Sequence, residues 1–497
     1  MRVLVIGVDG GTLDLIKPWA AHGLLPGFRS MLDSGAHGPL LSVVPPITGP
    51  AWSSFQTGKN PGQHGVFDWL KRGEGTYRLK PISAQSVRHD TLWHLIGQQG
   101  KRVGVMNVPV TYPPKPVNGF LVSGVLTPTR ARCFTYPDEV AAVLKAVAPE
   151  YAVVPKQAFD RRDPVPWIGS NVAMVDARCR AASHFMKSRP WDFFMVHFTA
   201  TDVVQHRMWH TIADSPEDNP VLTVHQAVDR AVAQLIDQLP ADTMVLIMSD
   251  HGFGALYEHI YLNNWLLQRG YLKLKRDPAT SLRRLLFSLG LTPANAYRVM
   301  SLLGILGRSL KLGKGARYNL LSKFFLSARS IDWGRTRAYS YGNVGQIYLN
   351  RADREPEGTV TKEEAEALLD ELCEALVAWR GRNGLQVMDH VWKKEEIYHG
   401  EMLFDAPDIL LLPRNLEAMA IGVSEFVSNR LVEPSFAFTG GHRMEGILMA
   451  SGRGVQAGAE IEGARIIDLA PTILKLLELD VPHDMDGRPL EALCGTP

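Results

Sequence analysis

The sequence has few cysteines, little net charge and no long apolar run. Four cysteines in 497 residues, none of them in a Cys-x-x-Cys pair, exclude a disulfide framework and a cysteine-rich metal site. The 53 basic residues nearly balance the 51 acidic ones, and a net charge of +2 provides no general field for nucleic acid. No segment approaches the ~18 consecutive apolar residues of a membrane-spanning helix. We therefore expect a cytoplasmic protein with reduced thiols and no sequence-specific nucleic-acid partner.

The composition is otherwise that of an ordinary folded protein. Hydrophobic residues make up 45% of the chain and charged residues 21%, which excludes a disordered, collagen-like or coiled-coil protein. At ~150 residues per domain, the length allows one large core with elaborations. Met1 and Arg2 are followed at once by an apolar run at 3–8, which predicts a buried strand and not a signal peptide.

Short apolar runs followed by polar clusters recur along the chain, at 3–8, 192–198 and 244–248. Amphipathic helical patterns at 172–187 and 221–238 lie between or beside them. Alternating strands and helices predict an α/β fold with a mostly parallel sheet covered on both faces. Ligands bind such sheets at the carboxyl ends of the strands, so the polar clusters are candidate site residues.

A basic stretch interrupts this alternation. Residues 269–329 contain thirteen basic residues and one acidic residue, with leucine and phenylalanine at helical spacing. We expect a basic helical cap or insertion at 265–330, between a first core part at 1–264 and a second core part at 331–497. Three interpretations are open: a solvated cationic face, a cap that attracts anionic substrate, or peripheral membrane contact.

Several Asp and His residues stand at predicted strand ends or in glycine-rich loops. They are Asp9, Asp202, His206, Asp250, His251 and His442. Mixed carboxylate and imidazole ligands suit zinc or manganese better than copper or magnesium. The Asp202-x3-His206 spacing places two ligands on one side of a helix. Adjacent Asp250 and His251 can instead point to different ions and bridge a two-metal centre.

A candidate nucleophile follows the prolines at 45–46. Pro50 fits a first helical position, which places Thr48 at the start of a helix carrying Trp52 and Phe55. The amino end of a helix binds phosphate, and a hydroxyl coordinated to a metal there loses its proton more easily. The simpler interpretation is that Thr48 only caps the helix.

The ordered combination of motifs resembles one enzyme family. It comprises Val8-Asp9-Gly10, Pro46-Ile47-Thr48-Gly49-Pro50-Ala51-Trp52, Asp202-x3-His206, Ser249-Asp250-His251-Gly252 and Gly441-His442. This set resembles the type I phosphodiesterase and nucleotide pyrophosphatase branch of the alkaline phosphatase superfamily. The segments 467–472 and 484–487 also look like the end of that fold. The resemblance implies an alkaline-phosphatase-like three-layer sandwich from residue 3 to about 490.

The resemblance also implies a mechanism. One zinc would be held by Asp202, His206 and His442, and a second by Asp9, Asp250 and His251, with manganese as an alternative. Thr48, touching the second ion, would be the nucleophile and would form a covalent phospho-threonine intermediate. The implied substrate is a small phosphoester, nucleotide or lipid-linked, with a diester favoured.

One departure from the family pattern keeps the ester class open. His64-Gly65 is followed by Val-Phe-Asp-Trp at 66–69, without the asparagine that holds a phosphoryl oxygen in the family. The Gly49 amide, Lys59 and His64 are candidates for stabilising this oxygen instead, and the sequence assigns none of them. Phosphomonoesterase, phosphomutase and sulfatase activities are therefore alternatives on the same fold, although a sulfatase needs Cys or Ser at position 48. From another class, a membrane-surface binding protein with a vestigial metal site is the remaining alternative.

Overall fold

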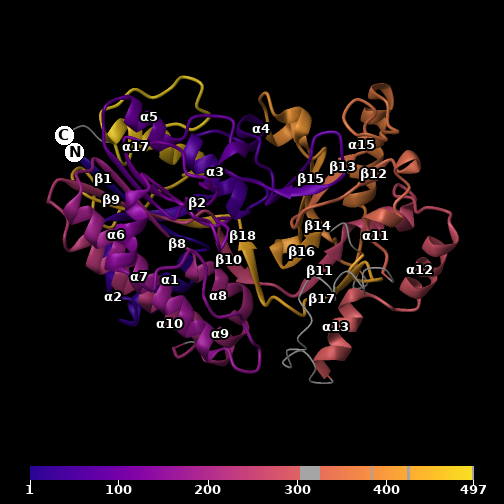
Figure 1. Cartoon of the computed structure of the whole chain (residues 1–497), viewed down its shortest axis with the longest axis horizontal. Helices are drawn as coiled ribbons and strands as arrows, with labels where there is room; N and C mark the ends of the chain where they lie inside the picture. The colour runs from indigo at the N-terminus through magenta and orange to yellow at the C-terminus, as the bar shows by residue number, and fades with distance from the viewer. Residues whose placement is uncertain (216, 303–324, 382–383, 423–425, 495–497) are drawn as a thin grey trace.

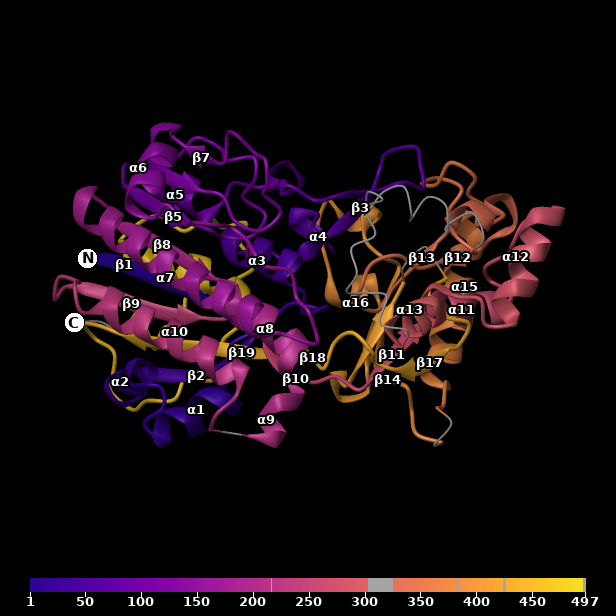
Figure 2. The same cartoon turned by 60° about the horizontal axis from the view of Figure 1, so that its bottom comes forward.

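The computed structural model describes residues 1–497 except 216, 303–324, 382–383, 423–425 and 495–497. The described chain forms two lobes, a larger one around the main sheet and a smaller one built from residues 258–434 (Figure 1). The strands β10 and β18 pair where the larger lobe meets the smaller one (Figure 2).

The main sheet has eight strands in the order β2-β19-β9-β1-β8-β5-β6-β7. Its central pairs, from β9 through β6, are parallel, whereas β2, β19 and β7 pair antiparallel at the two sides. In sheet order the strands are β2 (Ala36–Leu41), β19 (Glu445–Ser451), β9 (Thr243–Met248), β1 (Arg2–Val8), β8 (Phe193–Phe198), β5 (Val103–Met106), β6 (Gly119–Val122) and β7 (Thr135–Tyr136). The predicted α/β class is confirmed.

Alternation along β1 separates two hydrophobic cores. Leu4, Ile6 and Val8 face one core, whereas Val3 and Val5 face the other. Helices cover the first face: α1 (Leu13–Ala21), α2 (Pro26–Ser34), α6 (Glu139–Val147), α7 (Val165–Ser188), α8 (Ala200–Met208) and α10 (Pro220–Ile236). On the second face lie α3 (Thr48–Thr57), α5 (Leu92–Gln98) and α17 (Leu469–Leu476). These three layers are the predicted sandwich.

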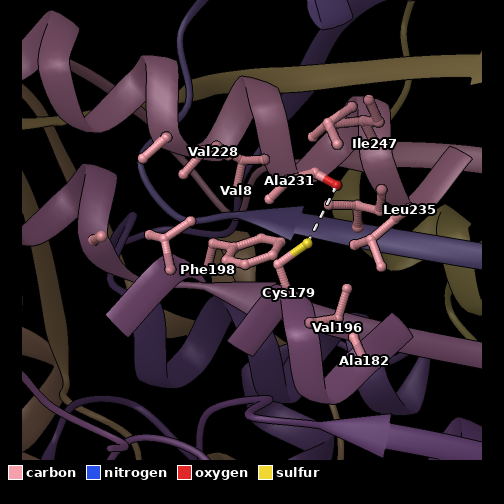
Figure 3. Close-up of a cluster of buried hydrophobic side chains, with 14 of the residues drawn as sticks. Val8, Cys179, Ala182, Val196, Phe198, Val228, Ala231, Leu235 and Ile247 are labelled. Carbon is pink, nitrogen blue, oxygen red and sulfur yellow. Dashed lines mark hydrogen bonds between the residues drawn. The ribbon is translucent and has the colours of Figure 1, made fainter. Parts of the chain in front are cut away.

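The first core also accounts for one of the four free cysteines. Cys179 of α7 lies among Val196, Ala231 and Leu235, and its Sγ is 3.8 Å from the Ala231 carbonyl oxygen (Figure 3). Burial raises the pKa of this thiol to about 12. Cys179 therefore acts as a small apolar side chain in the packing.

The smaller lobe has its own core. Two small sheets carry it, β16-β11-β17 and β12-β13-β15-β14. Their strands are β11 (Glu258–Tyr261), β12 (Ala338–Tyr339), β13 (Gln346–Leu349), β14 (Met388–Lys393), β15 (Ile409–Pro413), β16 (Ala418–Ile421) and β17 (Val432–Pro434). The helices are α11 (Leu262–Arg269), α12 (Pro278–Ser288), α13 (Pro293–Leu302), α15 (Lys362–Val377) and α16 (Lys394–Ile397).

The basic segment is part of this lobe. The core of the smaller lobe includes residues from Ile260 to Val432. Residues that follow 331 therefore pack with α11 in this lobe, and the chain returns to the larger lobe only at β18. The division into 1–264, 265–330 and 331–497 stays a prediction. Part of the basic stretch, including the leucine and phenylalanine pattern at 320–324, lies outside the described residues. In the described chain we find no helix of the length and apolarity needed to cross a membrane.

Candidate metal centre

Three neighbouring parallel strands deliver the candidate ligands to one edge of the sheet. β1 lies between β8 and β9, and Asp9 follows β1 directly. Asp250 and His251 follow β9, and the loop after β8 leads into α8 with Asp202 and His206. The carboxyl ends of these strands are adjacent, as predicted for a ligand site in an open α/β sheet.

A close approach of backbone segments holds this edge together. Gly10 has a φ of +66°, and a Cβ there would lie 2.9 Å from the Phe253 ring and 3.3 Å from the Asp202 Cα. Thr201 donates to the Asp9 carbonyl oxygen and Gln205 to that of Gly10. Glycine is therefore required where the end of β1 meets α8.

A second, two-stranded sheet brings in the last ligand. β10 (Gly252–Ala255) pairs antiparallel with β18 (Gly440–Arg443), and Phe253 is opposite His442. His206 and His442 are 236 positions apart in the chain, yet their Nε2 atoms are 3.0 Å apart. The imidazole rings of His251 and His442 stack with centroids 3.6 Å apart.

The structure divides the six residues into two groups. Asp9, Asp250 and His251 form the inner group, which is fully buried. The outer group consists of Asp202, His206 and His442, which are partly buried. In each group the potential ligand atoms lie within 4.8 Å of one another. The grouping is the one that the family resemblance implies, and metal binding by it stays a prediction.

The inward-facing atoms of the outer group are all acceptors. His206 Nδ1 donates to the Gly440 carbonyl oxygen at 3.0 Å, and His442 Nδ1 donates to that of Pro46 at 2.7 Å. Because a carbonyl oxygen only accepts, the proton of each neutral ring is on Nδ1, and both Nε2 lone pairs face each other and Asp202. Such an arrangement requires a cation, either a proton or a metal ion, between the rings.

The inner group has the same character. His251 Nδ1 donates to the Gly252 carbonyl oxygen, which leaves Nε2 as an acceptor 3.2 Å from Asp250 Oδ2 and 3.7 Å from Asp9 Oδ1. These two carboxylate oxygens are buried without a hydrogen-bond donor. Burial and the nearby His442 lower the pKa of His251 well below its usual value, so its ring is neutral. Converging acceptors of this kind fit a divalent cation.

Electrostatics distinguish the carboxylates. Burial, reinforced by Asp250, raises the pKa of Asp9 well above its ordinary value. Burial and the nearby Asp202 raise the pKa of Asp250 to about 7. Burial also acts to raise the pKa of Asp202, but His206 and His442 lower it well below the usual range. A divalent cation would offset the repulsion that keeps the inner carboxylates from ionising together.

Thr48 belongs to α3, which covers the face of the main sheet opposite to α8, and it contacts the inner group. It is the first residue of α3, and its Oγ1 is 3.2 Å from His251 Nε2. The helix begins two residues before Pro50, which therefore is not the first helical residue. As the first residues of a helix, Thr48 and Gly49 have amide hydrogens without an acceptor within the helix, which makes them potential donors to a bound anion.

His197 is a site residue that the sequence did not single out. It lies within β8, is fully buried, and places Nε2 2.9 Å from Asp9 Oδ2 and Nδ1 3.1 Å from the Asn107 carbonyl oxygen. Trp52 of α3 packs edge-on against its ring, and the absence of a side chain at Gly7 makes room for both rings. Burial and then Arg178 lower the pKa of His197 to about 3. Its only sequence signal is a histidine in an otherwise apolar strand.

Two of the substitutes considered for the missing asparagine have other partners. Lys59 Nζ forms a 2.7 Å ion pair with Asp484. His64 is fully buried, with Nε2 2.9 Å from Ser54 Oγ and Nδ1 accepting from the Val66 amide. Both residues support the turns that follow α3.

A model of the type I phosphodiesterase / nucleotide pyrophosphatase family matches residues 3–416. The chain belongs to this family. The predicted family and enzyme class, a phosphoric-ester hydrolase, are thereby confirmed. His442 lies beyond the matched residues, so its place in the centre depends on the pairing of β10 with β18.

Solved structures share the fold at low sequence identity. Phosphonoacetate hydrolase from Sinorhizobium meliloti 1021, in complex with phosphonoformate, aligns with a TM-score of 0.56 and 14% identity over 96% of this chain and 95% of that chain. Human ectonucleotide pyrophosphatase / phosphodiesterase 5 aligns with a TM-score of 0.54 and 14% identity over 97% of both chains. No curated protein matches the sequence. The predicted alkaline-phosphatase-like fold is confirmed by these neighbours.

Proposed function

We propose that this hydrolase cleaves a phosphodiester or pyrophosphate bond with Thr48 as its nucleophile, at a centre of two divalent ions, zinc or manganese. The observation that carries the proposal is the position of the Thr48 hydroxyl, 3.2 Å from His251 of the inner group and at the amino end of α3. When bound, the ions lower the pKa of hydroxyl groups and offset the negative charge of the phosphoryl group.

The residues of the chain define the course of the reaction. The Thr48 Oγ1–phosphorus bond forms as the bond from phosphorus to the leaving oxygen breaks; the hydroxyl proton is released and the leaving oxygen takes up a proton, which gives phospho-threonine and the free leaving group. Attack by water then breaks the Oγ1–phosphorus bond and restores the hydroxyl. The Gly49 amide supplies a fixed donor for a phosphoryl oxygen, because Lys59 and His64 are engaged elsewhere.

A nucleotide-containing diester or pyrophosphate is the substrate class that we propose. A mouse ectonucleotide pyrophosphatase / phosphodiesterase 5 with this fold was solved as an inactive variant in complex with AMP, at 13% identity to this chain. The family described above is named for phosphodiester and nucleotide pyrophosphate cleavage, which supports the same class.

The test begins with protein whose metal content has been counted. We expect bis-p-nitrophenyl phosphate to be hydrolysed faster than p-nitrophenyl phosphate or p-nitrophenyl sulfate, with phosphonoacetate as a further comparison. Preference for the monoester or the sulfate would keep the centre and overturn the proposed ester class.

The nucleophile is tested with an isosteric pair of variants on one helix. Thr48→Val should keep both ions and lower kcat by on the order of 10⁴-fold, because it removes the attacking oxygen. Thr57→Val, at the other end of α3 where Thr57 Oγ1 donates only to the Ser53 carbonyl oxygen, should keep kcat within about twofold. Near-normal turnover by Thr48→Val would show that water attacks the ester directly.

A further inference from the structure

The helix α12 presents its apolar face to solvent. Leu282, Leu285 and Leu289 recur at the spacing of one helical side and are 57%, 56% and 75% exposed. The opposite side carries Thr280, which is buried, and Phe287, which packs edge-on against Phe426. The helix is thus docked on the lobe through Thr280 and Phe287, and its leucines face away from the protein.

Exposed apolar side chains are concentrated at this place. In the described residues, thirteen large hydrophobic side chains are exposed, and five of them lie between 282 and 299. Leu291, after α12, and Val299, in α13, are 43% and 53% exposed. We call Leu282, Leu285, Leu289, Leu291 and Val299 the leucine surface. Figures 1 and 2 both show α12 at the outer edge of the smaller lobe, far from the main sheet. Clustered apolar exposure of this kind marks a contact surface.

The segment that carries the leucine surface is strongly basic. The described residues 269–302 include seven basic residues and a single acidic one, Asp277. The Asp277 carboxylate caps α12 by accepting from the Thr280 amide at 2.9 Å. Lys275 and Arg276, just before α12, are exposed, and Arg283 within the helix is partly exposed. The segment therefore combines exposed apolar side chains with basic side chains.

We propose that the leucine surface docks on an anionic lipid membrane, with the leucines in the headgroup layer and the neighbouring cations on lipid phosphates. Helices that lie in a membrane interface have an apolar face and basic residues on the flanks. Charge complementarity favours this occupant, because a second copy of the chain would bring two strongly basic segments together. The proposal goes beyond the proposed hydrolase activity and does not depend on it.

Vesicle co-sedimentation of the full chain tests the proposal. We expect binding to phosphatidylcholine vesicles that contain phosphatidylglycerol and much weaker binding to phosphatidylcholine alone. Raising sodium chloride from about 0.05 to 0.5 M should weaken the binding, because salt screens the cations. Absence of binding to the anionic vesicles at low salt would overturn the proposal.

Two matched sets of variants separate the apolar and charged parts. The triple variant Leu282→Gln, Leu285→Gln, Leu289→Gln should bind anionic vesicles about a hundredfold more weakly. The control Val165→Gln alters a 70% exposed side chain on α7 and should bind normally. The double variant Lys275→Gln, Arg276→Gln should bind anionic vesicles about fivefold more weakly for each charge removed. As a control, the double variant Arg161→Gln, Arg162→Gln removes an exposed basic pair from the larger lobe and should keep nearly its full affinity for the vesicles.

Other occupants give distinguishable results. Unchanged binding by the leucine triple variant would overturn the proposal. A dimer that the triple variant converts to a monomer, without vesicle binding by either protein, would overturn it in favour of self-association. Turnover of soluble bis-p-nitrophenyl phosphate by the triple variant should match that of the unaltered protein, which shows that the variant is folded. The vesicle experiment does not use turnover, so its result stands even if the hydrolase proposal fails.

Discussion

The inner and outer groups of ligands use the same kinds of side chain but are built differently. The inner group is at most 1% exposed and stands at the ends of two adjacent strands, with His197 behind Asp9. The side chains of the outer group are 14–17% exposed and come from α8 and the β10–β18 ribbon. The inner group is held by two strands of the main sheet, whereas the outer group is assembled from elements that meet at the junction of the lobes and is more accessible to solvent. We infer that the inner ion is the more firmly held and that the outer ion exchanges with solvent.

The largest expected effect is that of breaking the inner group. Asp250→Asn removes a buried carboxylate ligand and should reduce the metal content from two ions to one and kcat by on the order of 10³-fold. Metal analysis and turnover of bis-p-nitrophenyl phosphate measure both. Asp229→Asn is the control, because Asp229 is also buried but accepts from the Gly27 and Phe28 amides far from the centre. Two ions retained by Asp250→Asn would contradict the assignment.

Breaking the outer group should cost less. His442→Ala should lose the outer ion, keep the inner one, and lower kcat by about a hundredfold, since Thr48 retains its neighbours. His225→Asn, a buried histidine on α10 that donates to the Val221 carbonyl oxygen, is the control for removing a buried ring. Loss of both ions from His442→Ala would show that the two groups bind cooperatively and not separately.

His197 offers a way to weaken the inner group without touching a ligand. His197→Phe removes the polar ring atom next to Asp9 Oδ2 and should weaken binding of the inner ion by about 10–100-fold, leaving binding of the outer ion unchanged. Competition with a chelator measures the two affinities. His197→Gln, which can place an amide donor near the same oxygen, should recover most of the loss. Equal chelator curves for the Phe variant and the unaltered protein would make His197 a packing residue only.

The smallest effect is a pH dependence confined to the inner group. The folded-state pKa of Asp250, about 7, lies above its ordinary 3.8, so in metal-free protein the fold binds this proton more tightly than the unfolded chain does. Stability from Asp250 is therefore present at low pH and is lost as pH rises from about 4 to 7, by at most ~1.4 kcal/mol per pH unit. Relative to Asp250→Asn, the chelated protein should gain unfolding free energy between pH 7 and 5. A flat difference would show that Asp250 is ionised in the metal-free fold.

The sequence predicted the edge of the main sheet well because local signals coincide there. Asp9 and Asp250 each follow an apolar run whose length fits a buried strand, and the spacing of Asp202 and His206 is that of one helical turn. For α3, the sequence predicts Pro50 as the first helical residue, whereas the helix begins two residues earlier, at Thr48. Proline fits any position of a first helical turn, because none of the amide hydrogens there is used within the helix.

The remaining features depend on contacts between distant segments. β11, β16 and β17 are strands of three or four residues from 258–261, 418–421 and 432–434, too short for a clear alternation. His197 gives no sign of its role because its function depends on the register of β8 beside β1 and on the packing of Trp52. The outward leucines of α12 have the same spacing as a core helix, and only the docking side distinguishes the two cases.

The pairing of β10 with β18 also sets an order of events during synthesis. Asp9, Asp250 and His251 leave the ribosome before the smaller lobe has been made, whereas His442 follows 236 positions after His206 and on the far side of that lobe. A nascent chain can therefore assemble the inner group early, but the outer group has only two of its three ligands until the entire smaller lobe has been translated and its ends have met. If both groups bind ions, we expect a chain with a truncated or misfolded smaller lobe to bind only the inner ion, so that binding of the outer ion would indicate that translation and folding are complete.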